Sequence, residues 1–138
     1  VVYAEIIGYV GDTPIQRGYT YMHNPGEFST YVYRVVVGGF DLSWDALKQF
    51  CESRGLKYVP ELWRGLHRDF DVDKWMDTSY GGTAVPLAPE SPCDEGVTVR
   101  AEGITPLVLK AKSPLFLVFE GHSADAGRAD IEEEEGVA

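Results

Sequence analysis

Basic residues are scarce in this chain of 138 residues, where 12 lysines and arginines stand against 22 aspartates and glutamates and give a net charge of −10. A protein that binds nucleic acid tightly through its phosphates usually has the opposite balance. No apolar run reaches the roughly 18 residues of a membrane-spanning helix, and no charged-then-apolar signal peptide opens the chain. The two cysteines, Cys51 and Cys93, match no zinc or redox spacing. These absences argue against a membrane span and a disulfide scaffold, and they favour a cytoplasmic protein.

The acidic residues are unevenly distributed. From Glu120 onward seven carboxylates accompany a single base, Arg128, whereas the preceding residues hold 15 acids and 11 bases. Residues 124–138, with small side chains and a run of glutamates, are typical of a solvated, disordered segment. We therefore expect one domain over residues 1–119, with enough apolar residues for a core, and an acidic disordered tail over residues 120–138.

Strand patterns dominate the expected domain. Runs of β-branched or alternating apolar residues predict strands over residues 1–7, 31–37, 97–101, 107–112 and 115–119. One helix is clear, because Ser43 is a good N-cap and Gly55 a good terminator around the apolar stripe of Leu47, Phe50 and Cys51. A shorter helix is predicted from Asp71 through Trp75 and Met76, and a loop over residues 80–92. The fold class we expect is α+β with mainly antiparallel sheet.

Two neighbouring segments carry the clearest chemical signal. Side chains alternate along a strand, so Lys110 and Lys112 share one face of the strand 107–112. Two adjacent ammonium groups repel each other unless an anion lies between them. Shortly before, Glu95 precedes Gly96 at the start of the strand 97–101. A carboxylate and two lysines suit a metal-bound phosphate, although an edge strand whose lysines only prevent aggregation would show the same pattern.

These motifs resemble those of a known superfamily. E-G-V-T-V-R (95–100) and L-K-A-K (109–112) resemble motifs IV and V of the covalent nucleotidyltransferases, the ATP-dependent ligases and mRNA capping enzymes. Residues 2–8, V-Y-A-E-I-I-G, resemble motif III, and residues 31–37 lie where motif IIIa places an aromatic ring against adenine. The run G-D-T-P-I-Q-R-G resembles a G-x-x-I-Q-K stretch of phage RNA ligases that seal nicks in RNA duplexes. The resemblance covers residues 1–119 and implies a nucleotidyltransferase (adenylation) domain, incomplete at its N-terminus.

The resemblance also implies an activity and its cofactors. In these ligases ATP adenylates a lysine, the AMP moves to an RNA 5′-phosphate, and a 3′-hydroxyl displaces it, with Mg²⁺ assisting. By resemblance, Glu95 would hold Mg²⁺, and Lys110 and Lys112 would grip the α-phosphate. The residues implied in nucleotide or RNA binding are Glu5 (ribose or the metal site), Tyr33 (adenine) and Gln16 (RNA or pocket support).

Simpler interpretations of these residues stay open. Glu5 could be a surface residue of a half-buried strand. Tyr33 could belong to the core, since Tyr31 lies on the same face and could be the stacking ring instead. We expect Arg100 to make a salt bridge rather than to contact substrate.

The chain departs from the RNA ligase pattern at two points. The nucleophilic lysine of these enzymes lies in a K-x-D-G motif before motif III, and none of the five lysines here is followed by x-Asp-Gly. Arg34 also stands where those ligases usually have an aspartate.

From the first departure we expect the C-terminal part of an adenylation domain, inactive alone in lysine adenylation. Its expected partners are RNA ends and a segment that carries the nucleophile, and exposed strand edges around residues 1–7 should favour self-association. A DNA ligase or capping enzyme is a poorer match, because the 26 residues after Lys112 are too few for the OB-fold that follows motif V. A non-catalytic nucleotide-binding or regulatory relative is the remaining alternative.

Overall fold

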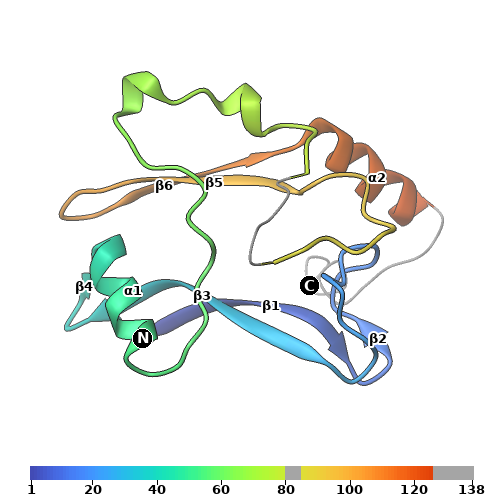
Figure 1. Ribbon diagram of the computed structural model, residues 1–138, viewed down its shortest axis with the longest axis horizontal. Helices are drawn as coiled ribbons and strands as arrows, with labels where there is room; N and C mark the ends of the chain where they lie inside the picture. The colour runs from blue at the N-terminus through green and yellow to red at the C-terminus, as the bar shows by residue number, and fades with distance from the viewer. Residues whose placement is uncertain (80–84, 126–138) are drawn as a thin grey trace. The chain divides into compact units, whose positions relative to one another are not determined.

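The computed structural model describes residues 1–79 and 85–125. Within these residues the chain forms an α+β fold with antiparallel sheets and two α-helices (Figure 1). Among the helices of the described ranges, none is long and apolar enough to cross a membrane. The chain divides into two compact units, each described here by itself. The first unit comprises Val1–Ile6, Thr30–Phe70 and Thr98–Lys110, and the second comprises Ile7–Ser29, Asp71–Val97 and the described residues of 111–138.

A four-stranded sheet has the strand order β2-β1-β3-β4. Its strands are β1 (Val2–Val10), β2 (Thr13–Pro14), β3 (Phe28–Val37) and β4 (Phe40–Asp41). The pairs β1–β2 and β3–β4 are antiparallel, with Tyr9 opposite Pro14 and Val36 opposite Asp41. The strands predicted over residues 1–7 and 31–37 are therefore confirmed; β1 ends three residues later than predicted, and β3 begins three residues earlier.

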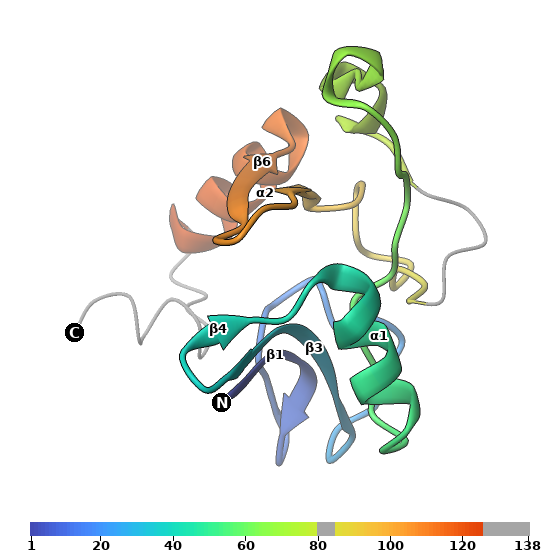
Figure 2. The same cartoon turned by 90° about the vertical axis from the view of Figure 1, so that its left-hand side faces the viewer.

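The core of the first unit forms where helix α1 (Trp44–Glu52) packs against β3 (Figure 2). Ser43 caps the helix as predicted, since its hydroxyl accepts a hydrogen bond from the amide of Ala46. The buried residues of this core are Val32, Val35, Leu47 and Cys51. The segment after the helix contributes a parallel bridge to this unit, between Tyr58 and Val32.

A two-stranded sheet pairs β5 (Gly96–Ala101) with β6 (Leu107–Lys112), close to the predicted ranges. Helix α2 (Pro114–Asp125) follows β6 directly. In the second unit, Phe116 of this helix packs with Tyr19 and Cys93 in a separate buried cluster. Cys51 and Cys93 are both buried free thiols.

The strand predicted over residues 115–119 is wrong, because these residues lie in α2. A continuous apolar run such as L-F-L-V-F fits a buried strand and a buried helix equally well. The residues before it decide the outcome. The Ser113 carbonyl accepts a hydrogen bond from the Leu117 amide, and Pro114 occupies the first helical position, where its fixed φ is favourable.

Three further expectations concern the remaining segments. The short helix predicted near Asp71 is a 3₁₀ turn, η2 (Val72–Trp75), capped by the Asp71 side chain and preceded by η1 (His67–Asp69). The predicted loop 80–92 has no regular structure over residues 85–92, and residues 80–84 lie outside the described ranges. The boundary expected between residues 119 and 120 falls inside α2, so residues 120–125 are helical, and residues 126–138 of the predicted tail lie outside the described residues.

Candidate functional site

Two of the residues discussed above, Glu5 and Tyr33, share one exposed face in the first unit with Tyr3. The rings of Tyr3 and Tyr33, on β1 and β3, have centroids 6.4 Å apart and are tilted by 43°. Both side chains remain open to solvent, at 38% and 41% of their possible exposure. Glu5 is exposed as well and, two residues beyond Tyr3, lies on the same face of β1. The structure thus brings a carboxylate and two aromatic rings to one face of the sheet, whereas Tyr31 is half-buried.

Arg34 has a specific partner. Its guanidinium donates to both carboxylate oxygens of Asp41, with Nε–Oδ1 2.6 Å and Nη2–Oδ2 3.1 Å. These hydrogen bonds hold the pKa of Asp41 below its usual range. The same guanidinium lies over the ring of Tyr3, 5.0 Å from its centroid. Arg34 therefore joins β4 to the Tyr3 ring.

Glu95 lies in the second unit, immediately before β5. Its Oε2 accepts a hydrogen bond of 3.0 Å from the Tyr21 hydroxyl, and its backbone carbonyl accepts one of 2.8 Å from the Ser113 amide. Burial, and then the nearby Glu95 charge, raise the pKa of Tyr21. Burial likewise raises the pKa of Tyr19, whose hydroxyl donates to the Cys93 carbonyl. Sequence reasoning missed Tyr21, because no local pattern connects residues 74 positions apart.

The backbone requires glycine at Gly8, in the segment that resembles motif III, and at Gly96, in the segment that resembles motif IV. Gly96 has φ +142°, and a Cβ there would lie 2.0 Å from the backbone oxygen of Ala111. Gly8 has φ +110°, and its Cβ would lie 2.5 Å from the carbonyl oxygen of Glu27. In both places two backbone segments approach too closely for any side chain, and the conformation itself favours glycine.

The two lysines of β6 are both exposed, but they belong to different units. Lys110 lies in the first unit, with Glu5 and Tyr33, whereas Lys112 lies in the second, with Glu95. Lys112 has partners on α2, since its Nζ is 3.9 Å from a carboxylate oxygen of Glu120 and 5.4 Å from the centre of the Phe116 ring.

Gln16 and Arg100 complete the set of residues discussed from the sequence. Gln16 is half-buried in the second unit, in a turn where its backbone carbonyl accepts a hydrogen bond from the Tyr19 amide. Arg100 makes the expected salt bridge, with Glu102 at 2.5 Å, and also donates to the carbonyl of Leu42 at 2.7 Å.

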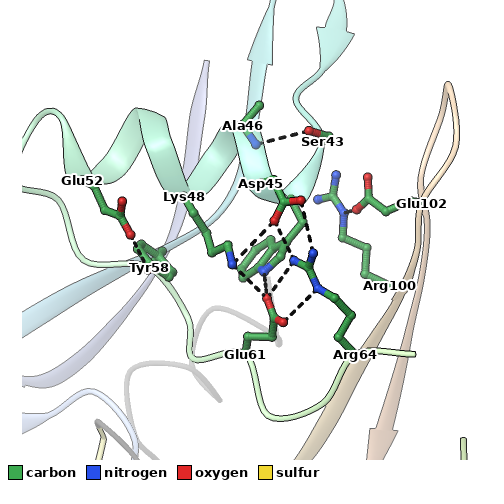
Figure 3. A network of polar contacts seen from close by, with 11 residues as sticks. Ser43, Asp45, Ala46, Lys48, Glu52, Tyr58, Glu61, Arg64, Arg100 and Glu102 are labelled. Atoms are coloured by element: carbon green, nitrogen blue, oxygen red, sulfur yellow. Dashed lines mark hydrogen bonds and ion pairs between the residues drawn. The ribbon is translucent and has the colours of Figure 1, made fainter. Parts of the chain in front are cut away.

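A second charged cluster, beside α1, is structural (Figure 3). Glu61 accepts hydrogen bonds from Trp44, Lys48 and Arg64 at 2.7–3.2 Å, and Arg64 also donates to both carboxylate oxygens of Asp45. The Arg64 hydrogen bonds lower the pKa of both carboxyls. Because the acids and bases of this cluster pair with one another, it holds the segment after α1 against the helix and needs no ligand to balance its charge.

Within the described ranges, no three His, Cys, Asp or Glu side chains form a group that could hold a metal ion. Glu5 and Glu95, the two carboxylates assigned to a metal by resemblance, lie in different units. Comparison of the chain with protein-family models, with curated proteins and with solved structures gives no significant match. The resemblance to RNA ligases therefore rests on the motifs themselves.

Proposed function

We propose that this chain is the nucleotide-holding part of an RNA ligase-type nucleotidyltransferase, which joins RNA 5′-phosphate and 3′-hydroxyl ends through lysyl-AMP and RNA-adenylate intermediates. The observation that supports it best is the exposed face of the first unit, where Glu5 and Tyr33 lie with a second ring, Tyr3. A face of this kind offers aromatic stacking for a base and a carboxylate for the hydroxyls of a ribose.

The charge of the first unit adds support. It contains eight lysines and arginines and seven aspartates and glutamates, a net charge of +1, and the rest of the sequence holds the other four bases and 15 acids. Phosphates of a nucleotide or an RNA end meet less repulsion at a near-neutral surface than at one with an excess of carboxylates. The excess of acidic residues thus lies outside the first unit, whose own charge is more favourable for an anionic ligand than the whole-chain charge of −10.

In the proposed reaction each residue has one task. Tyr33 would stack on adenine, Glu5 would bind the ribose, and Lys110, in the same unit, would neutralise charge on the α-phosphate as the adenylyl group is transferred. The motif resemblance gives Lys112 the same task. Mg²⁺, when bound, would supply further charge neutralisation at the phosphates. By resemblance, Glu95 would provide a carboxylate to this ion, which is usually held by one or two carboxylates together with water and substrate phosphates.

The nucleophilic lysine would come from another segment, since no lysine of these 138 residues precedes x-Asp-Gly. The buried free thiols of Cys51 and Cys93 suit a reducing compartment, and we place the ligase in the cytoplasm. The second candidate is a non-catalytic nucleotide-binding relative. Two observations favour it: the missing K-x-D-G motif, and Arg34, which stands where the ligases usually have an aspartate and is paired with Asp41.

ATP binding and lysine adenylation test the proposal. We expect the chain to bind ATP with Mg²⁺ in equilibrium titrations, and Lys110→Ala or Lys112→Ala to weaken binding about tenfold or more, because a hydrogen bond to a charged group contributes roughly 1.5–3 kcal/mol. Lys74→Ala, in η2, is the matched control. With labelled ATP the chain alone should stay unlabelled, and adding a K-x-D-G segment from a phage-type RNA ligase should produce a labelled lysine on that segment.

The alternatives give different results. Failure to bind ATP would reject both the ligase and the nucleotide-binding relative. A stable lysine-AMP adduct on Lys110 or Lys112 would contradict the roles given to them. Binding of ATP without labelling, even with the added segment, would favour the non-catalytic relative.

A further inference from the structure

The aromatic face of the first unit contains more than the single stacking ring that the motifs indicate. Tyr3 is close to Tyr33, with ring centroids 6.4 Å apart, and its ring keeps 38% of its possible exposure. The rings are tilted by 43° and do not lie face to face on each other. Exposed aromatic rings on neighbouring strands are a common means of stacking nucleobases on a sheet.

The ring of Tyr3 is also held in place. The Arg34 guanidinium lies 5.0 Å from its centroid, and two hydrogen bonds to Asp41 fix that guanidinium in turn. A planar guanidinium can pair bidentately with a carboxylate and stack on a ring at the same time, which a lysine ammonium cannot do. Asp41 therefore orients Arg34, and Arg34 orients Tyr3.

We infer that Tyr3 is a second base-contacting residue that favours purines, and that Arg34 is its positioning residue; this inference rests on the proposed function. A purine has two fused rings, so a purine stacked on Tyr33 reaches further toward the neighbouring Tyr3 ring than a pyrimidine does. A single pyrimidine ring is too small to use both tyrosines equally well. Arg34, which departs from the ligase pattern, would therefore contribute to base selection by positioning Tyr3.

Titration with ATP and with CTP tests this inference. Stacking of a base on an aromatic side chain contributes roughly 1–3 kcal/mol, so Tyr3→Leu should weaken ATP binding about fivefold or more. CTP binding should change much less, so the preference for ATP over CTP should shrink. Tyr3→Phe keeps the ring and should keep both affinities. Arg34→Lys should reduce the preference in the same direction, but less than Tyr3→Leu does.

Controls separate this inference from loss of folding and from failure of the proposed function. Phe40→Leu removes another exposed aromatic ring of the first unit and should leave both affinities unchanged. Thermal melts of each variant should show that it is folded. If the unmodified chain binds ATP but Tyr3→Leu leaves the ATP-to-CTP preference intact, the inference is wrong while the proposed function stands. If the unmodified chain binds neither nucleotide, both are rejected.

Discussion

The Tyr21 hydroxyl donates a hydrogen bond of 3.0 Å to Oε2 of Glu95, joining two residues 74 positions apart. Tyr21 reaches this position from a left-handed backbone conformation, with φ +51°, which is uncommon for a residue with a bulky side chain. Backbone strain of this kind persists where surrounding contacts fix it. The bond orients the carboxylate that resembles the motif IV glutamate, whether or not that carboxylate binds a metal.

Removing this bond should destabilise the fold in a pH-dependent way. Tyr21→Phe should lower the free energy of unfolding by about 1–2 kcal/mol at pH 7, because a half-buried carboxylate loses a hydrogen-bond donor. The folded state raises the pKa of Tyr21, so its contribution is complete below the ordinary tyrosine pKa of about 10 and is lost as the pH rises above it. Urea unfolding at pH 7, 9 and 10.5 measures the difference.

Tyr9→Phe, a change to another tyrosine in the second unit, is the control and should have a smaller effect at pH 7. A Tyr21→Phe variant as stable as the unmodified chain at pH 7 would show that this hydrogen bond contributes nothing to folding.

Gly96→Ala should be among the most destabilising single changes in the second unit. The new methyl group would lie 2.0 Å from the Ala111 carbonyl oxygen, and alanine is strained at φ +142°. The two effects together should cost at least about 2 kcal/mol of unfolding free energy, measured by chemical denaturation. Gly103→Ala is the matched control, because the nearest atom to its Cβ would be 3.4 Å away, and it should change stability little. Equal stability of the two variants would contradict the close approach of β5 and β6.

Local patterns predicted local structure well, and they failed where the deciding contact is distant. The cap at Ser43 and the alternation of residues 107–112 are visible in the sequence, and α1 and β6 form as predicted. The Arg34–Asp41 pair was predictable in principle, because Gly38 and Gly39 are typical of a tight hairpin turn that places β4 beside β3. In contrast, Tyr21 meets Glu95 only through tertiary folding.

Local sequence was also insufficient to predict helix α2. Its apolar run could not distinguish a helix from a strand, and Ser113-Pro114 was the only local signal of a helix start. The Asp77 side chain also caps the start of α2. Asp77 precedes Ser113 by 36 residues, and no sequence pattern connects it with α2.

The Asp77 cap of α2 should stabilise the fold less at acid pH. The Asp77 carboxylate accepts hydrogen bonds from the Ser113 hydroxyl and from the Leu115 amide, the latter at 2.9 Å, and these bonds lower its pKa. A carboxyl with a lowered folded pKa stabilises the fold above its ordinary pKa of about 3.9 and loses that effect as the pH falls through the folded value. Asp77→Ala should therefore lower the melting temperature at pH 7, and the difference should shrink as the pH falls below about 3.9.

Asp77→Asn provides the matched comparison. Asparagine keeps one acceptor oxygen and tolerates the left-handed backbone at this residue, where φ is +52°. Its melting temperature at pH 7 should lie between those of Asp77→Ala and the unmodified chain, and it should depend less on acid. A constant difference between Asp77→Ala and the unmodified chain from pH 7 to pH 2.5 would exclude a role for the Asp77 charge.

The first unit exposes apolar side chains on β1 and β6 that favour association with another chain. Val2 and Ile6 keep 46% and 50% of their possible exposure, and Leu107 and Leu109 keep 60% and 59%. The strand β6 pairs with β5 alone among the described strands. Unpaired strand edges and exposed apolar patches promote pairing between chains. We therefore expect the chain to self-associate at micromolar concentration in sedimentation velocity experiments.

Charge placed on these strands should weaken the association. Ile6→Lys and Leu109→Lys should each shift the distribution toward monomer, because a lysine on an exposed strand opposes pairing between chains. Gln49→Lys, on the exposed face of α1, adds the same charge elsewhere and should leave the distribution unchanged. A monodisperse monomer that melts cooperatively would contradict the prediction. It would also favour the non-catalytic nucleotide-binding module over a ligase part that needs a second segment, because a stable monomer would not require a partner to cover these strands.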